Sequence, residues 1–115
     1  MIVPAFHVHL GFGALLVVFS VPLVLRWVPM NRAYGIRVAE AFSSEARWYD
    51  INAYGGRIFL VYGFLLIGFA LATRDLAPPA TSLWSPVFHG APMIGVLLLL
   101  PLIRAYARRR QREGP

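Results

Sequence analysis

A charge-free apolar stretch from Phe6 to Leu25 constrains the fold of this chain more than any other feature. About 20 apolar residues are the length that an α-helix needs to cross the ~30 Å hydrocarbon core of a bilayer. Hydrophobic residues make up 58% of the sequence, which exceeds the roughly 45–50% that is usual in soluble domains. The sequence therefore predicts an integral membrane protein.

Two further apolar runs complete the predicted architecture. The expected fold class is an all-α membrane protein with three transmembrane helices, at about residues 6–28, 55–73 and 87–105 of a single membrane domain, 1–115. The segment between the first two spans, residues 29–54, is too polar to cross a bilayer. We expect it to lie at the cytoplasmic membrane interface and to pack against the second helix.

The second span is predicted to be the end of one longer helix. Ser43 or Ser44 is placed to cap this helix, and Glu45 in the first turn suits the positive end of the helix dipole. Small residues then recur at a regular spacing along the helix, at Gly56, Gly63 and Ala70. Such a stripe predicts close approach of another helix, because membrane helices pack through small residues.

The Arg residues are unevenly distributed about the spans. Five lie between Arg26 and Arg57 and five from Arg104 onward, whereas Arg74 is alone on the other side. Since cytoplasmic loops are enriched in Arg and Lys, the polar segment and the C-terminus are predicted to be cytoplasmic and the N-terminus to face outward. We expect the basic tail, residues 106–115, to be a frayed terminus that binds anionic lipid headgroups, with no role for nucleic acid.

Side chains of the polar segment form the candidate ligand-binding site: Asn31, Arg32, Tyr34, Arg37, Glu45, Trp48 and Asn52. Two Arg flanked by Tyr and Trp at headgroup depth can hold a phosphate or carboxylate through paired N–H donors. Glu45 is expected to pair with Arg32 or Arg37 and to organise them, while Asn52 is expected to bond the loop backbone. Alternatively, these residues only satisfy one another and solvent, since exposed ion pairs contribute ~0–1 kcal/mol each.

The same segment resembles a family signature. It reads Asn31-Arg32-x-Tyr34-Gly35-Ile36-Arg37, then Ser44-Glu45-x-x-Trp48, then Asn52-x-x-Gly55. This pattern is similar to that of the SdpI family of small bacterial membrane proteins, which is named for a toxin-immunity protein. The resemblance implies a helical protein of the bacterial inner membrane with its signature at the cytoplasmic face. For the namesake it also implies immunity to a secreted peptide toxin, coupled to membrane capture of a repressor.

The sequence favours a non-enzymatic protein that binds a peptide or lipid at the cytoplasmic interface and acts in toxin resistance or signalling. A small accessory subunit of a larger membrane complex is one alternative, with partner contacts along the small-residue stripe. A membrane-embedded enzyme acting on a lipid phosphate is another, and it would need Glu45 or Asp50 for turnover. We find no nucleophile, metal or cofactor constellation in the sequence, and self-association is compatible with only three spans.

Three histidines lie near the predicted outer face, where two spans meet. His7 and His9 open the first span and His89 opens the third, so they are candidates for holding a metal or a haem. Residues two apart on a helix point in different directions, however, and Asp75 is the only nearby carboxylate. We therefore expect these histidines to form hydrogen bonds rather than a metal site.

Overall fold

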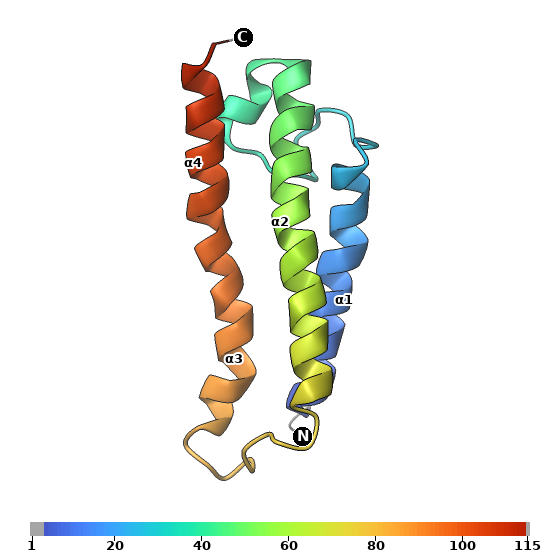
Figure 1. Ribbon diagram of the computed structural model, residues 1–115, viewed down its shortest axis with the longest axis vertical. Helices are drawn as coiled ribbons and strands as arrows, with labels where there is room; N and C mark the ends of the chain where they lie inside the picture. The colour runs from blue at the N-terminus through green and yellow to red at the C-terminus, as the bar shows by residue number, and fades with distance from the viewer. Residues whose placement is uncertain (1–3, 115) are drawn as a thin grey trace.

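The computed structural model describes residues 4–114 and is all-helical over that range. Its elements, in order, are α1 (Ala5–Val24), η1 (Ala39–Ser43), α2 (Glu45–Ala72), α3 (Ser85–Gly95), η2 (Val96–Leu98) and α4 (Leu99–Arg112). α3, η2 and α4 follow one another in a single column (Figure 1). This column, α1 and α2 are each long and apolar enough to cross a membrane. The predicted three-span helical fold is therefore confirmed.

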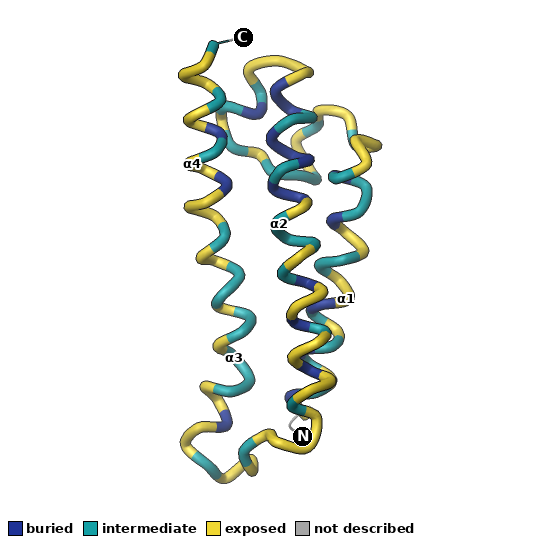
Figure 2. The backbone as a smooth tube through the Cα atoms, in the orientation of Figure 1, coloured by how far each residue is buried: buried dark blue, intermediate teal, exposed yellow. Residues whose placement is uncertain are grey.

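The molecule is an elongated bundle with two distinct ends. One end, here called the loop end, holds the segment 25–44, the start of α2 and the end of α4, while the connector 73–84 lies at the opposite end (Figure 1). The best-buried apolar cluster is at the loop end, where Trp48 and Ile51 of α2 pack with Ile103 of α4. Figure 2 shows this concentration of buried positions on α2 and on the facing side of α4. The buried apolar core of the bundle is thus concentrated at the loop end.

α1 ends four residues earlier than the predicted limit of the first span. The Trp27 N–H donates to the carbonyl of Pro22 at 2.9 Å, and the Arg26 N–H donates to that of Leu23 at 3.2 Å. These two bonds, with Arg26 at a φ of 61°, form a Schellman motif. Glycine is the usual residue at this position, and because Arg stands there instead, the helix end at Val24 has no local sequence signal.

The small-residue stripe on α2 is the surface against which α1 packs. A Cβ atom at Gly63 would lie 2.9 Å from the Gly13 carbonyl oxygen of α1, and one at Gly56 would lie 3.2 Å from the Val24 nitrogen. The predicted close approach of a helix is therefore confirmed, and the approaching helix belongs to the same chain. Because α1 covers the stripe, it is not the exposed partner surface that the accessory-subunit alternative requires.

The third span packs more loosely than the other two. Only 6% of its most apolar window is buried, compared with 28% for α2, and Figure 2 shows mostly exposed and intermediate positions along it. The helix tightens at η2, where the Val96 N–H donates to the Met93 carbonyl instead of that of Pro92. The Tyr62 hydroxyl of α2 donates to this Pro92 carbonyl. A side chain of α2 thus hydrogen-bonds the backbone of the third span just before the point where that helix tightens.

Tyr62→Phe should remove this bond between spans with little change in shape. We expect the free energy of unfolding to fall by about 0.6–1.7 kcal/mol, the range measured for hydrogen bonds between membrane helices. SDS titration of the protein in mixed micelles measures the change. Tyr49→Phe is the matched control, because the Tyr49 hydroxyl has no bonding partner within residues 4–114. Equal stability of the two variants would contradict this role for Tyr62.

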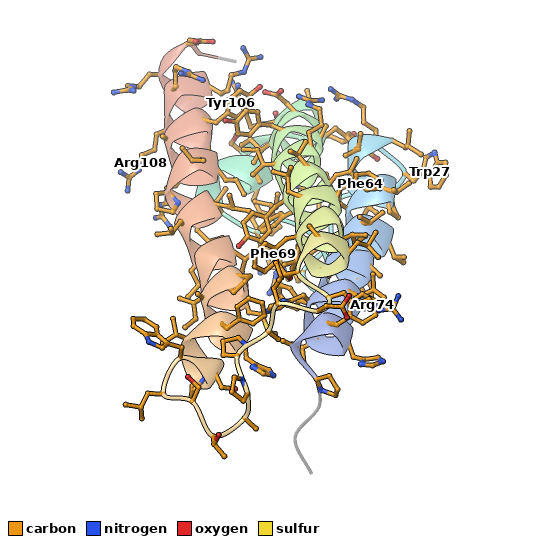
Figure 3. The ribbon with its side chains drawn as sticks, turned by 60° about the horizontal axis from the view of Figure 1, so that its bottom comes forward. Trp27, Phe64, Phe69, Arg74, Tyr106 and Arg108 are labelled. Carbon is orange, nitrogen blue, oxygen red and sulfur yellow. The ribbon has the colours of Figure 1, made fainter. Side chains whose placement is uncertain are left out.

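The basic tail is helical through Arg112, so the prediction of a frayed terminus was wrong, whereas its binding to anionic headgroups stays a prediction. Asp50 of α2 accepts hydrogen bonds from the Tyr106 hydroxyl at 2.7 Å and from Arg110 Nε at 2.8 Å. Tyr106 also stacks on Tyr54, with ring centroids 3.8 Å apart, and lies on the side of α4 that faces α2 (Figure 3). These contacts hold the last turns of α4 against α2.

Candidate functional site

Residues 25–44, which connect α1 to α2 and are here called the clamped segment, are fastened to α2 by two buried side chains of that helix. Trp48 has no exposed surface, and its indole N–H donates to the Val28 carbonyl at 2.9 Å. The Asn52 side chain accepts from the Ile36 N–H at 2.6 Å and donates to the Ile36 carbonyl at 3.3 Å. The predicted bonding of Asn52 to the loop backbone is therefore confirmed. Ser44 caps α2 by accepting from the Arg47 N–H at 3.0 Å, which is one of the two serines proposed for that role.

Two glycines of the signature make this close contact possible. Gly35 has a φ of 124°, and a Cβ atom there would lie 2.7 Å from the Asn52 side-chain oxygen. Gly55 leaves the space on α2 that the Ile36 side chain fills, beside Ile103 of α4. The loop thus enters the junction of α2 and α4 at a point where only glycine leaves room.

The start of the segment is fixed to itself and to α1. The Asn31 side-chain oxygen accepts from the backbone N–H groups of Ala33 and Tyr34, at 2.8 and 2.7 Å. The Tyr34 hydroxyl donates to the Phe19 carbonyl of α1. Partial burial raises the pKa of this hydroxyl above its ordinary value, so it stays protonated and able to donate. Asn31, Tyr34, Trp48 and Asn52 of the candidate set therefore all make contacts within the chain.

The three charged members of the candidate set remain exposed. Arg37 donates one guanidinium N–H to the Arg32 carbonyl at 2.8 Å, which leaves the other N–H groups of Arg37 for a ligand. Glu45 forms no ion pair with either Arg, so the predicted pairing was wrong. It lies in the first turn of α2, and the carboxylate that organises this end is Asp50 instead.

A pocket lies between the segment and α4. It is about 560 Å³ in volume and is lined by backbone and side chains of residues 35–39, by Phe59 of α2, and by Leu100, Ile103 and Arg104 of α4. We call it the loop pocket. Its charged lining residues are Arg37 and Arg104, and no acidic residue of the described range 4–114 lines it. The candidate site predicted from the sequence included Arg37 but not the α4 residues, because more than 60 positions separate them from Arg37 in the chain.

Helix contacts bring three Arg, one within or just beyond the loop end of each span, to a common level. Gly56 faces Val24 of α1, and Gly55 faces Ile103 of α4. The residues next to these contacts are Arg26, Arg57 and Arg104. From Arg57 to the end of α2, 16 residues would span about 24 Å at 1.5 Å per residue, close to the ~30 Å hydrocarbon core. The three Arg therefore mark the expected headgroup level of the loop end.

Two of the three histidines, His9 and His89, are in contact at the opposite end of the bundle. His9 is fully buried, and its Nε2 donates to the His89 carbonyl at 3.1 Å. The His89 ring itself bonds through Nδ1 to the Ser85 carbonyl at 2.9 Å, while His7 is exposed. Within residues 4–114 no three His, Cys, Asp or Glu side chains are grouped to hold a metal. Hydrogen bonding by His9 and His89 agrees with the sequence-based prediction.

These features define a small three-span helical membrane protein in which the segment after the first span is clamped onto the second. The sequence profile of the SdpI/YfhL protein family matches residues 27–104, and the chain belongs to this family. The matched region includes the clamped segment, α2 and the third span as far as Arg104. No curated protein and no solved structure matches the chain significantly.

Proposed function

We propose that this protein binds the anionic group of a membrane-associated peptide or lipid in the loop pocket, at the cytoplasmic face of the bacterial inner membrane. The observation that carries the proposal is the lining of the pocket, where Arg37 and Arg104 are the charged residues and Phe59, Leu100 and Ile103 supply apolar surface. An amphiphile matches this combination, because its charged and apolar parts each meet suitable groups.

The clamped segment supports the proposal energetically. Binding costs free energy when a flexible loop must be ordered, and a loop that is already ordered avoids that cost. Here Trp48 and Asn52 hold the backbone at Val28 and at Ile36, the residue just before Arg37, before any ligand arrives. The guanidinium can then offer paired N–H donors to a carboxylate or phosphate. Arg32 lies on the same segment and can add charge to the site.

The distribution of charge supports the cytoplasmic orientation. The loop end carries both the Arg of the polar segment and those of the tail, whereas the connector at the opposite end carries Arg74. An excess of Arg marks the cytoplasmic side of a membrane protein. Under this orientation the N-terminus faces outward and the C-terminus is cytoplasmic.

Toxin resistance or signalling would follow from occupancy of the loop pocket. A bound peptide would be withheld from the rest of the membrane, which is a route to resistance. A ligand that contacts both the segment and α4 would favour the arrangement in which the two lie together, and such a population shift can be relayed to a partner. Both roles depend on binding, so binding is the property to test first.

Arg37→Ala should abolish ligand retention while leaving membrane insertion intact. Native mass spectrometry of protein extracted gently from its own membrane compares the masses retained by the wild type and the variant. Arg112→Ala removes one exposed Arg of the tail and is the matched control. We expect the loop-pocket ligand, a peptide or lipid, on the wild type and on the control, and we expect its mass to be missing from Arg37→Ala. A second protein retained equally by all three forms, with no small ligand, would favour an accessory subunit and overturn the proposal.

A further inference from the structure

A second opening lies between α2 and α4 and shares no lining residue with the loop pocket. It is about 370 Å³ in volume, and its lining includes Tyr54, Arg57, Val61, Tyr62, Leu65 and Leu99. We call it the span groove. Among the residues that the structure describes, Arg57 is the one charged residue that lines it, and Arg57 is exposed. Arg57 forms no ion pair with any residue between 4 and 114, so its charge has no partner in the described chain.

The span groove runs from the headgroup level toward the middle of the bilayer. Arg57, Val61 and Leu65 are spaced four residues apart on α2, so they lie in a row along the helix axis. At 1.5 Å per residue, this row is about 12 Å long. Arg57 is at the level of Arg26 and Arg104, because the contacts of Gly55 and Gly56 align the three spans there. A positive charge at the surface is thus followed by apolar side chains in the direction of a lipid chain.

We propose that the span groove binds one acyl chain of an anionic phospholipid, with the phosphate on Arg57. The loose packing of the third span gives the lipid a structural role, because only 6% of its most apolar window is buried within the protein. An ordered chain in the groove would supply the van der Waals contacts that α2 and α4 do not make with each other. This proposal goes beyond the loop pocket and uses different residues.

The groove is narrow enough for an acyl chain to lie within it, whereas a helix of another protein could only pack across its rim. About 370 Å³ over ~12 Å gives a mean cross-section of ~30 Å². A helix with its side chains is ~10 Å or more in diameter, which corresponds to roughly 80 Å². The charge of Arg57 selects an anionic over a zwitterionic headgroup, since an Arg near the surface contributes ~1 kcal/mol toward anionic lipid.

The test is native mass spectrometry of the purified full chain in detergent, titrated with palmitoyl-oleoyl phosphatidylglycerol or with the matching phosphatidylcholine. The wild type should bind one phosphatidylglycerol about fivefold more tightly than phosphatidylcholine, the factor that corresponds to ~1 kcal/mol. Arg57→Gln should remove this preference. Val61→Phe should weaken the binding of both lipids, because the larger side chain fills the groove. Circular dichroism checks that each variant keeps its helices.

Two control variants separate this site from general charge effects and from the loop pocket. Arg112→Gln removes an exposed tail Arg, and Arg37→Ala alters the loop pocket; both should keep the wild-type lipid preference. The proposal is overturned if wild type binds the two lipids equally, or if Arg112→Gln lowers the preference as much as Arg57→Gln does. It is also overturned if Val61→Phe binds both lipids as tightly as the wild type does. Loss of the loop-pocket ligand in Arg37→Ala with phosphatidylglycerol retained would show that the two sites are independent.

Discussion

Gly63→Leu is expected to force α1 away from α2 and to cause one of the two largest losses of stability in the molecule. The Cβ atom of a leucine at position 63 would lie 2.9 Å from the Gly13 carbonyl oxygen and 3.0 Å from the Leu16 Cβ. Both neighbours are fixed to the backbone of α1, so no side-chain rotation relieves the contact. Overpacking typically costs about 1–3 kcal/mol, and we expect at least the upper end of that range.

SDS titration in mixed micelles measures the effect, and Gly68→Leu supplies the matched control. Gly68 lies on the same helix, but a Cβ atom there meets nothing within 4 Å. We expect the unfolding midpoint of Gly63→Leu to fall well below that of the wild type and Gly68→Leu to stay close to it. Similar midpoints for the two variants would show that α1 does not approach α2 through this position.

Trp48→Ala is expected to release the polar segment from α2. Trp48 is fully buried, it packs on Phe42 with ring centroids 5.3 Å apart, and it donates to the Val28 carbonyl. Truncation of a buried Trp to Ala costs about 3–5 kcal/mol. Trp48→Phe should lose less, because it keeps an aromatic ring and gives up only the indole donor and part of the volume.

Limited trypsin digestion measures the release, since Arg32 and Arg37 are cleavage sites within the clamped segment. We expect cleavage there to be much faster in Trp48→Ala than in the wild type, with Trp48→Phe in between. Trp27→Ala is the control, because Trp27 is 68% exposed and points away from the bundle (Figure 3). Equal cleavage of Trp48→Ala and Trp27→Ala would contradict the clamp.

The spans and the packing stripe were predictable because their signals are local. Helix length, charge-free composition and small residues at regular spacing depend on neighbouring positions along one helix. The end of α1 was not predictable in the same way, because Arg26 occupies the left-handed position where glycine is usual. The ordered tail was missed for another reason, since Asp50 and Arg110 are 60 residues apart in the chain.

The candidate site was predicted in part. The signature located the segment and the bonding of Asn52, because an amide facing a loop has few other partners near a membrane surface. The choice of Glu45 as organiser was wrong, since proximity in sequence does not bring a first-turn carboxylate to the loop that precedes it. Phe59 and Arg104 became part of the loop pocket only through the packing of α4 on α2. One sequence feature does point to Arg104 as a headgroup-level residue, namely its position as a basic residue at the end of an apolar span.

Photo-crosslinking from inside the loop pocket tests the central proposal most directly. Phe59→p-benzoylphenylalanine places a photoreactive group in the pocket lining, and Phe64→p-benzoylphenylalanine places the same group on an exposed, lipid-facing position of α2. After irradiation in cells, we expect position 59 to yield an adduct of one discrete mass that disappears when Arg37→Ala is added. Adducts at position 64 should be unaffected by that change. Adducts at position 59 that are the same with and without Arg37 would contradict ligand binding in the loop pocket.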